Sequence, residues 1–106
     1  MELNELRNKI DNIDDQMVEL FAQRMQTTAD IAEYKRKNSI GILDGGRQRE
    51  ILCRVTEKAG EDLELYTRVF FNTLFALSRS FQSKYMAHTS PLIENIKTAL
   101  ENTKKQ

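Results

Sequence analysis

The stretch that decides the fold is LNELRNKIDNIDDQMVELFAQRMQTTADIAEYKRK, residues 3–37, which contains no glycine and no proline. Its seam positions recur at alternating spacings of three and four residues, as in one continuous helix with a coiled-coil-like face. They are Leu3, Leu6, Ile10, Ile13, Met17, Leu20, Arg24, Thr27, Ile31 and Tyr34. Such a helix is about 52 Å long, whereas a compact domain of this size has a radius of gyration near 13 Å. The other 70 or so residues cannot cover both ends of the helix, so its length predicts an intertwined homodimer.

The breaks after this stretch divide the chain into shorter helices. Clustered glycines mark a loop at residues 38–46, and Gly60 marks a second break. We expect one helix over residues 47–58, with Asp44 as its N-cap, and another over residues 62–85. No stretch alternates apolar and polar residues, so no sheet is expected. The sequence therefore predicts an all-α, three-helix protomer with one very long first helix.

The chain is long enough for one domain only. We assign residues 1–88 to that domain and residues 89–106 to a C-terminal tail or linker. Ser90 and Pro91 are suited to the N-cap and first position of a short helix within this tail.

The composition excludes several classes of function. The 106 residues carry 16 Lys and Arg against 16 Asp and Glu, whereas a nucleic-acid binder needs a basic excess. One cysteine and one histidine are too few for a disulfide framework or a Cys/His metal site. No apolar run approaches the roughly 18 residues of a membrane span, and the amino terminus lacks a signal-peptide pattern. We therefore expect a cytoplasmic protein without nucleic-acid or membrane partners.

Cations interrupt the seam of the first helix. Arg24 occupies the core-facing row, and Lys35 follows about 16 Å along the axis and only about 20° round the helix. The two cations therefore share one face, although an isolated seam arginine can also extend its head group into water. Arg7 lies about 260° round the helix from Arg24. It cannot easily reach a pocket beside its own Arg24, but it can reach the pocket of a partner subunit.

The last helix shows a matching interruption. Its main apolar stripe consists of Leu63, Tyr66, Phe70, Leu74, Leu77 and Phe81. A second strip passes from two aromatic residues, Phe71 and Phe75, to two hydrogen-bonding ones, Ser78 and Gln82. Taken alone, this strip fits a face that turns toward solvent.

The start of the second helix adds further polar residues. Taken alone, Asp44 fits a helix cap, and Arg47 and Gln48 fit a solvated first turn. Taken together, these residues, the Arg24 and Lys35 face and the Ser78 and Gln82 strip predict a cavity between helices, lined by Arg, Lys, Gln and Ser. Such a cavity suits a small, multiply anionic ligand. No nucleophile–base pair accompanies it.

In this order the motifs resemble those of the all-helical chorismate mutases. They are LRNKIDNIDDQMVELFAQR at 6–24, AEYKRKN at 32–38, the D-x-x-R of Asp44 to Arg47 and the S-x-x-x-Q of Ser78 to Gln82. The resemblance covers about residues 3–86 and implies an intertwined dimer, either free-standing or as the first domain of a bifunctional enzyme. It also implies conversion of chorismate to prephenate, on the route to phenylalanine and tyrosine. This intramolecular Claisen rearrangement needs no cofactor and no metal.

The resemblance implies a role for each candidate site residue. Arg7 would cross the dimer to one substrate carboxylate, and Arg24 would bind the other from the same chain. Lys35 would touch a carboxylate and the ether oxygen, and Gln82 would donate a hydrogen bond to that oxygen from its far side. Further substrate contacts are implied for Asp44, Arg47, Gln48 and Ser78.

Gln48 departs from the family pattern, which has a glutamate here to accept a hydrogen bond from the ring hydroxyl of the substrate. An amide oxygen also accepts, but without charge assistance, so we expect activity to survive with some loss of rate or affinity. The alternative hypothesis is a non-catalytic helical dimerisation or regulatory module. The long seam alone would support it, and it predicts no saturable binding of small dicarboxylates.

Overall fold

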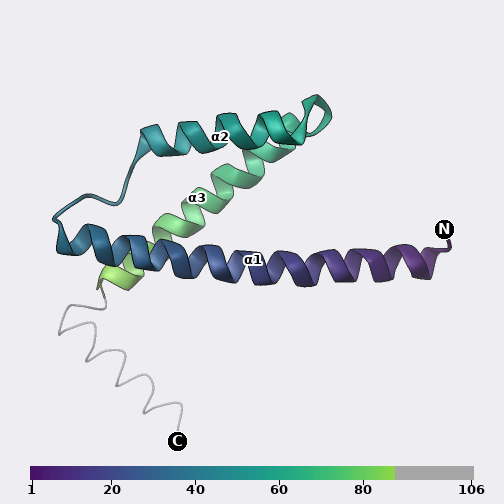
Figure 1. Ribbon diagram of the computed structural model, residues 1–106, viewed down its shortest axis with the longest axis horizontal. Helices are drawn as coiled ribbons and strands as arrows, with labels where there is room; N and C mark the ends of the chain where they lie inside the picture. The colour runs from purple at the N-terminus through teal and green to yellow at the C-terminus, as the bar shows by residue number, and fades with distance from the viewer. Residues whose placement is uncertain (88–106) are drawn as a thin grey trace, which may run out of the picture.

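The computed structural model describes residues 1–87, which form three helices and one short 3-10 turn (Figure 1). Helix α1 spans Leu3–Lys37 and helix α2 spans Gly45–Ala59. The 3-10 turn Glu61–Leu63 leads into helix α3, Glu64–Ala87. No strand occurs in this part of the chain, which confirms the all-α prediction. The predicted tail, residues 89–106, lies outside the described residues.

Helix α1 extends well beyond the part of it that α2 and α3 cover. It runs unbroken for 35 residues, and α2 and α3 lie over only part of it (Figure 1). Its two buried residues, Ala29 and Ala32, both belong to its C-terminal half. The Cα radius of gyration is 18.4 Å, well above the value of about 13 Å for a compact domain of this length. None of the helices within residues 1–87 could cross a membrane, α1 included.

The ends of α2 follow from local sequence. The Asp44 carboxylate accepts a 3.0 Å hydrogen bond from the backbone N–H of Arg47, as an N-cap does. With this cap in place, both following glycines are helical, so α2 begins at Gly45 and not at the predicted residue 47. Gly60 ends the helix at φ 88° and ψ 168°, a conformation that is almost restricted to glycine.

The second strip of α3 is more deeply buried than the stripe expected to be the main one. Along the expected main stripe, Leu74 is buried, but Tyr66 and Phe70 are more than half exposed. On the second strip, Phe75, Ser78 and Gln82 are only 4–6% exposed. The reason is the crossing of α3 over α1, which turns the strip with the polar residues inward. The solvent-facing interpretation of that strip is therefore wrong.

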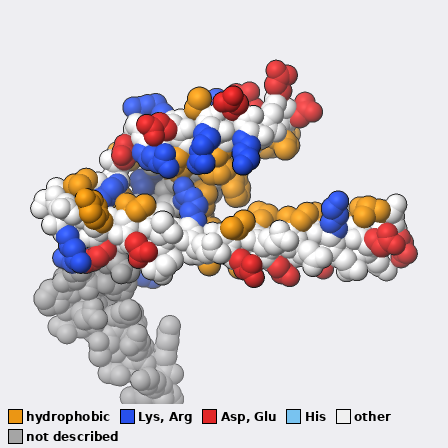
Figure 2. Space-filling view, in the orientation of Figure 1, with side chains coloured by type: hydrophobic (Ala, Val, Ile, Leu, Met, Phe, Trp, Pro, Cys, Tyr) orange, Lys and Arg blue, Asp and Glu red, His pale blue; other side chains and the backbone are white. Residues whose placement is uncertain are grey.

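The N-terminal half of α1 keeps its apolar seam uncovered. Five seam residues in this half are all at least 41% exposed, namely Leu6, Ile10, Ile13, Met17 and Leu20. Figure 2 shows apolar side chains in a row along the edge of α1 that faces α2. A stripe of this length exceeds the scattered apolar exposure of ordinary monomers, so the protomer presents a large unpartnered apolar surface.

The conformation of Gly60 provides a test of the α2–α3 connection. Gly60→Ala should lower the free energy of unfolding by about 1–3 kcal/mol, because an L side chain is strained in this backbone region. Gly41→Ala is the matched control, since nothing lies within 4 Å of a Cβ added there and its φ is not in the positive range. Urea unfolding at one fixed protein concentration measures both. Equal midpoints for the two variants would contradict the assignment of strain to residue 60.

Candidate active site

One cavity of about 360 Å³ lies where the C-terminal half of α1, the loop after it, the start of α2 and the end of α3 meet. Seven of the eight residues proposed from sequence line it, namely Arg24, Lys35, Asp44, Arg47, Gln48, Ser78 and Gln82. They come from segments up to 58 residues apart in the chain, and the crossing of the helices brings them together.

Arg7 is the one proposed site residue that does not line this cavity. It is exposed and lies 17 residues before Arg24 on the same straight helix, about 26 Å along the axis. Within one protomer the two arginines therefore cannot act on one small ligand.

Arg24 is held in place by α3. Its Nη1 donates a 2.8 Å hydrogen bond to the Ser78 hydroxyl oxygen, and its guanidinium carbon lies 5.9 Å from the centre of the Phe75 ring. Burial, and then the like charge of Arg47, lower the pKa of Arg24 below its ordinary value. Arginine nevertheless stays protonated in proteins, and a guanidinium has five N–H donors. Most of those donors remain available to an anion in the cavity.

Lys35 ties the loop after α1 to the cavity. Its Nζ donates a 2.9 Å hydrogen bond to the backbone carbonyl oxygen of Ile42. This contact places the loop against the face of α1 that carries Arg24 and leaves two ammonium protons for a ligand. Ile42 thus contributes to this contact through its backbone and not through its side chain.

Gln82 is almost fully buried and is also positioned by α1. Its Nε2 donates a 3.2 Å hydrogen bond to the backbone carbonyl oxygen of Thr28. A side-chain amide nitrogen carries two protons, and the second forms no hydrogen bond with another residue of the described chain. The amide is therefore fixed in orientation and still has a donor to offer.

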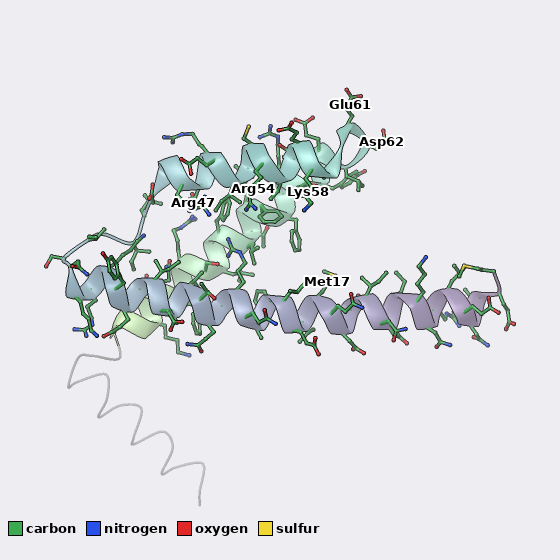
Figure 3. The ribbon with its side chains drawn as sticks, in the orientation of Figure 1. Met17, Arg47, Arg54, Lys58, Glu61 and Asp62 are labelled. Carbon is green, nitrogen blue, oxygen red and sulfur yellow. The ribbon has the colours of Figure 1, made fainter. Side chains whose placement is uncertain are left out.

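The first turn of α2 supplies the remaining polar groups. The Asp44 carboxylate is engaged as the helix cap, so it is not a free base. Arg47 forms a 3.4 Å ion pair with Glu50 at the surface, and Figure 3 shows it extending from the side of α2 that faces the other helices. Gln48 is half-buried and lines the cavity.

The cavity is strongly cationic and has little capacity for covalent chemistry. Its lining holds four cations against one carboxylate, a net charge of +3. It contains no histidine and no cysteine, and no group of three metal-ligating side chains occurs within residues 1–87. Ser78 is the hydroxyl nearest the cations, and it accepts a hydrogen bond from Arg24 and has no base beside it. This arrangement can bind an anion, orient it and stabilise developing negative charge.

Sequence reasoning did not propose the other seven residues that line the cavity, namely Thr27, Thr28, Ile31, Ile42, Ile51, Phe75 and Arg79. Phe75 lies on the polar strip of α3 and was available as a candidate. Arg79 carried a usable signal, because it lies three residues before Gln82 and such residues are neighbours on a helix surface. The carbonyl contact of Ile42 has no sequence signal, since every residue has a carbonyl.

The net charge of the lining leads to a binding prediction. Glutarate should raise the melting temperature, because a dianion offsets the repulsion between Arg24 and Arg47. At tenfold its Kd it would add about 1.4 kcal/mol of stability, or about 5–10 °C in Tm for a domain of this size. Acetate at equal ionic strength and the Arg24→Met variant serve as controls. Equal Tm shifts with glutarate and acetate would contradict a dianion site.

Comparison with known proteins agrees with this geometry. Residues 6–83 match the family described as chorismate mutase type II. A chorismate mutase from Methanocaldococcus jannaschii is 31% identical over 90 residues, which cover 82% of this chain and 90% of the relative. No solved structure matches the chain significantly. Because the family match spans well over half of the chain and includes every segment that lines the cavity, the protein belongs to the chorismate mutase type II family.

Proposed function

We propose that the protein converts chorismate to prephenate, on the route to phenylalanine and tyrosine. One observation carries the proposal beyond family membership. Arg24, Lys35 and Gln82 line one cavity, and each is held there by a hydrogen bond that leaves donors unused. A rearrangement within one molecule needs only binding, orientation and charge stabilisation, which such a cavity can provide.

Binding is the first task of the site. Chorismate is a dianion that must be held in a compact conformer in which its two reacting carbons meet. Two well-placed cations can fix both carboxylates, which supplies much of the orientational entropy of the reaction in advance. Arg24 suits one carboxylate because a guanidinium presents a planar fork of donors, and the Ser78 contact sets the position of that fork. Like-charge repulsion from Arg47 is offset when the dianion arrives.

Stabilisation of the transition state is the second task. Negative charge grows on the ether oxygen as the carbon–oxygen bond breaks, while the total charge of the substrate stays the same. Lys35 and Gln82 are proposed to donate to this oxygen, using the protons not engaged by Ile42 and Thr28. Their contacts strengthen as the charge develops, so they lower the barrier more than they tighten binding. Donors fixed in advance need no reorganisation during the reaction.

Gln48 is proposed to accept a hydrogen bond from the ring hydroxyl of the substrate. It is half-buried in the cavity, beside Arg47 and one turn from the Asp44 cap. A neutral amide gives a weaker bond here than a carboxylate would. It also leaves Asp44 as the only carboxylate of the lining, so the net charge of +3 is preserved for the dianion.

The protein is proposed to act as a homodimer. The exposed seam of α1 supports this, as does an apolar groove of about 490 Å³ lined by residues of α1 and α3, among them Met17, Phe21 and Phe70. The seam is on every copy, so two copies can bury it against each other. Such an arrangement would also allow Arg7 of one chain to enter the cavity of the other.

The role of Lys35 has a matched control on the same helix. Lys35→Ala should lower kcat by about 10²–10³-fold, which is the usual effect of removing one donor to a developing oxyanion. Lys37→Ala removes an equal charge from an exposed position whose ion pair with Glu33 lies at the surface, and it should leave kcat unchanged. Chorismate loss followed by absorbance, with prephenate identified as the product, measures both. A folded wild-type dimer without turnover would favour the non-catalytic module instead.

The cross-dimer role of Arg7 can be tested by subunit mixing. Arg7→Ala and Arg24→Ala homodimers should each be nearly inactive, since every site lacks one arginine. Unfolding and refolding an equal mixture yields half heterodimers, and each contains one intact site. Activity should therefore return to about a quarter of the wild-type level. If both arginines served a site within one chain, mixing would restore no activity.

A further inference from the structure

Arg79 is the one basic residue of the cavity lining for which the family pattern implies no role. It is half-buried on α3 and lines the same cavity as Arg24 and Lys35. It directly follows Ser78 and precedes Gln82 by three residues, so it is a surface neighbour of the proposed ether-oxygen donor. A cation at this position lies within reach of any ligand that Gln82 touches.

Arg79 also lacks the acidic partner that several exposed arginines of the protein have. Arg36, Arg47 and Arg68 each pair with a glutamate three or four residues away. The sequence of α3 contains no acidic residue after Glu64, so no such pair is open to Arg79. No hydrogen bond or ion pair joins it to any other residue of the described chain.

The surroundings of Arg79 make an unpaired cation costly. Three other cations line the cavity, and its only carboxylate, Asp44, is engaged at the start of α2. Like charges that line one cavity repel one another. Within the described chain Arg79 has no anionic partner, so an anionic ligand is the group that would offset this repulsion.

We propose that Arg79 is a further substrate-binding residue, which contacts a carboxylate of the dianionic ligand from the same chain that supplies Arg24. The proposal rests on the proposed function for the identity of that ligand. The alternative is that Arg79 is a solvated side chain at the rim of the cavity, which would make no contact with substrate.

The chemistry of the reaction predicts how this contact would show itself. The substrate carboxylates keep their charge from ground state to transition state, so a carboxylate contact binds both about equally. Such uniform binding affects KM and leaves kcat nearly unchanged. Arg79 should differ in this respect from Lys35 and Gln82, whose proposed contacts are with the oxygen that gains charge.

The experiment compares Arg79→Met with Arg68→Met, which removes the same charge from an exposed position on the same helix. Methionine is a good helix former of similar length. If Arg79→Met does not fold, Arg79→Gln takes its place in the comparison. Arg79→Met should raise the KM for chorismate about 5- to 20-fold, with kcat within about twofold of wild type. Arg79→Lys should recover part of the loss, and Arg68→Met should match wild type.

A second measurement separates this proposal from the proposed function. Calorimetric titration with glutarate should show a Kd raised by a similar factor in Arg79→Met and unchanged in Arg68→Met. Wild-type protein without turnover would refute the proposed function, yet the glutarate titration would still decide the role of Arg79. Unchanged KM and unchanged glutarate affinity in Arg79→Met would overturn the role, and so would a loss confined to kcat.

Discussion

The structure depends on one constraint, which is that α1 is longer than its own chain can cover. Its C-terminal half carries the only two α1 residues that are buried, Ala29 and Ala32, and these allow close packing. Its N-terminal half presents an apolar seam that the described protomer leaves largely exposed (Figure 2). One helix thus forms one wall of the cavity and also presents the surface proposed to bind a second copy. The proposed dimer follows because burial of that seam is worth about 25 cal/mol per Å².

The contacts that hold α1 against α3 are also those that shape the site. Ser78 and Gln82 are buried polar residues, and each bonds to α1, through Arg24 and the Thr28 carbonyl. Buried polar groups need such partners, and satisfied ones favour a single packed arrangement over alternatives. The fold and the proposed site therefore share the same hydrogen bonds. Donors that are already fixed by packing are what electrostatic catalysis requires, because they need no reorganisation as charge develops.

Much of this could be predicted from the sequence because it depends on neighbours along the chain. The absence of glycine and proline over residues 3–37 predicted α1, and the Asp44 cap and Gly60 stop predicted α2. The face shared by Arg24 and Lys35 follows from helical geometry alone. The inward strip of α3 could not be chosen in this way. Taken alone, its polar residues resemble a solvent face, although together with Arg24 and Lys35 they predicted a cavity. The crossing of α3 over α1 decides which of the two strips is buried.

The sequence by itself determined three helices, the residues that begin and end α2, and a set of cations on helix faces, because helix periodicity and capping are local properties. Only the tertiary structure decided which faces meet. It brought the Ile42 carbonyl to Lys35 and placed the Phe75 ring beside Arg24. It also turned Arg79 into the cavity lining. The physical reason is that such contacts join residues far apart in the chain, and their geometry depends on how whole helices cross.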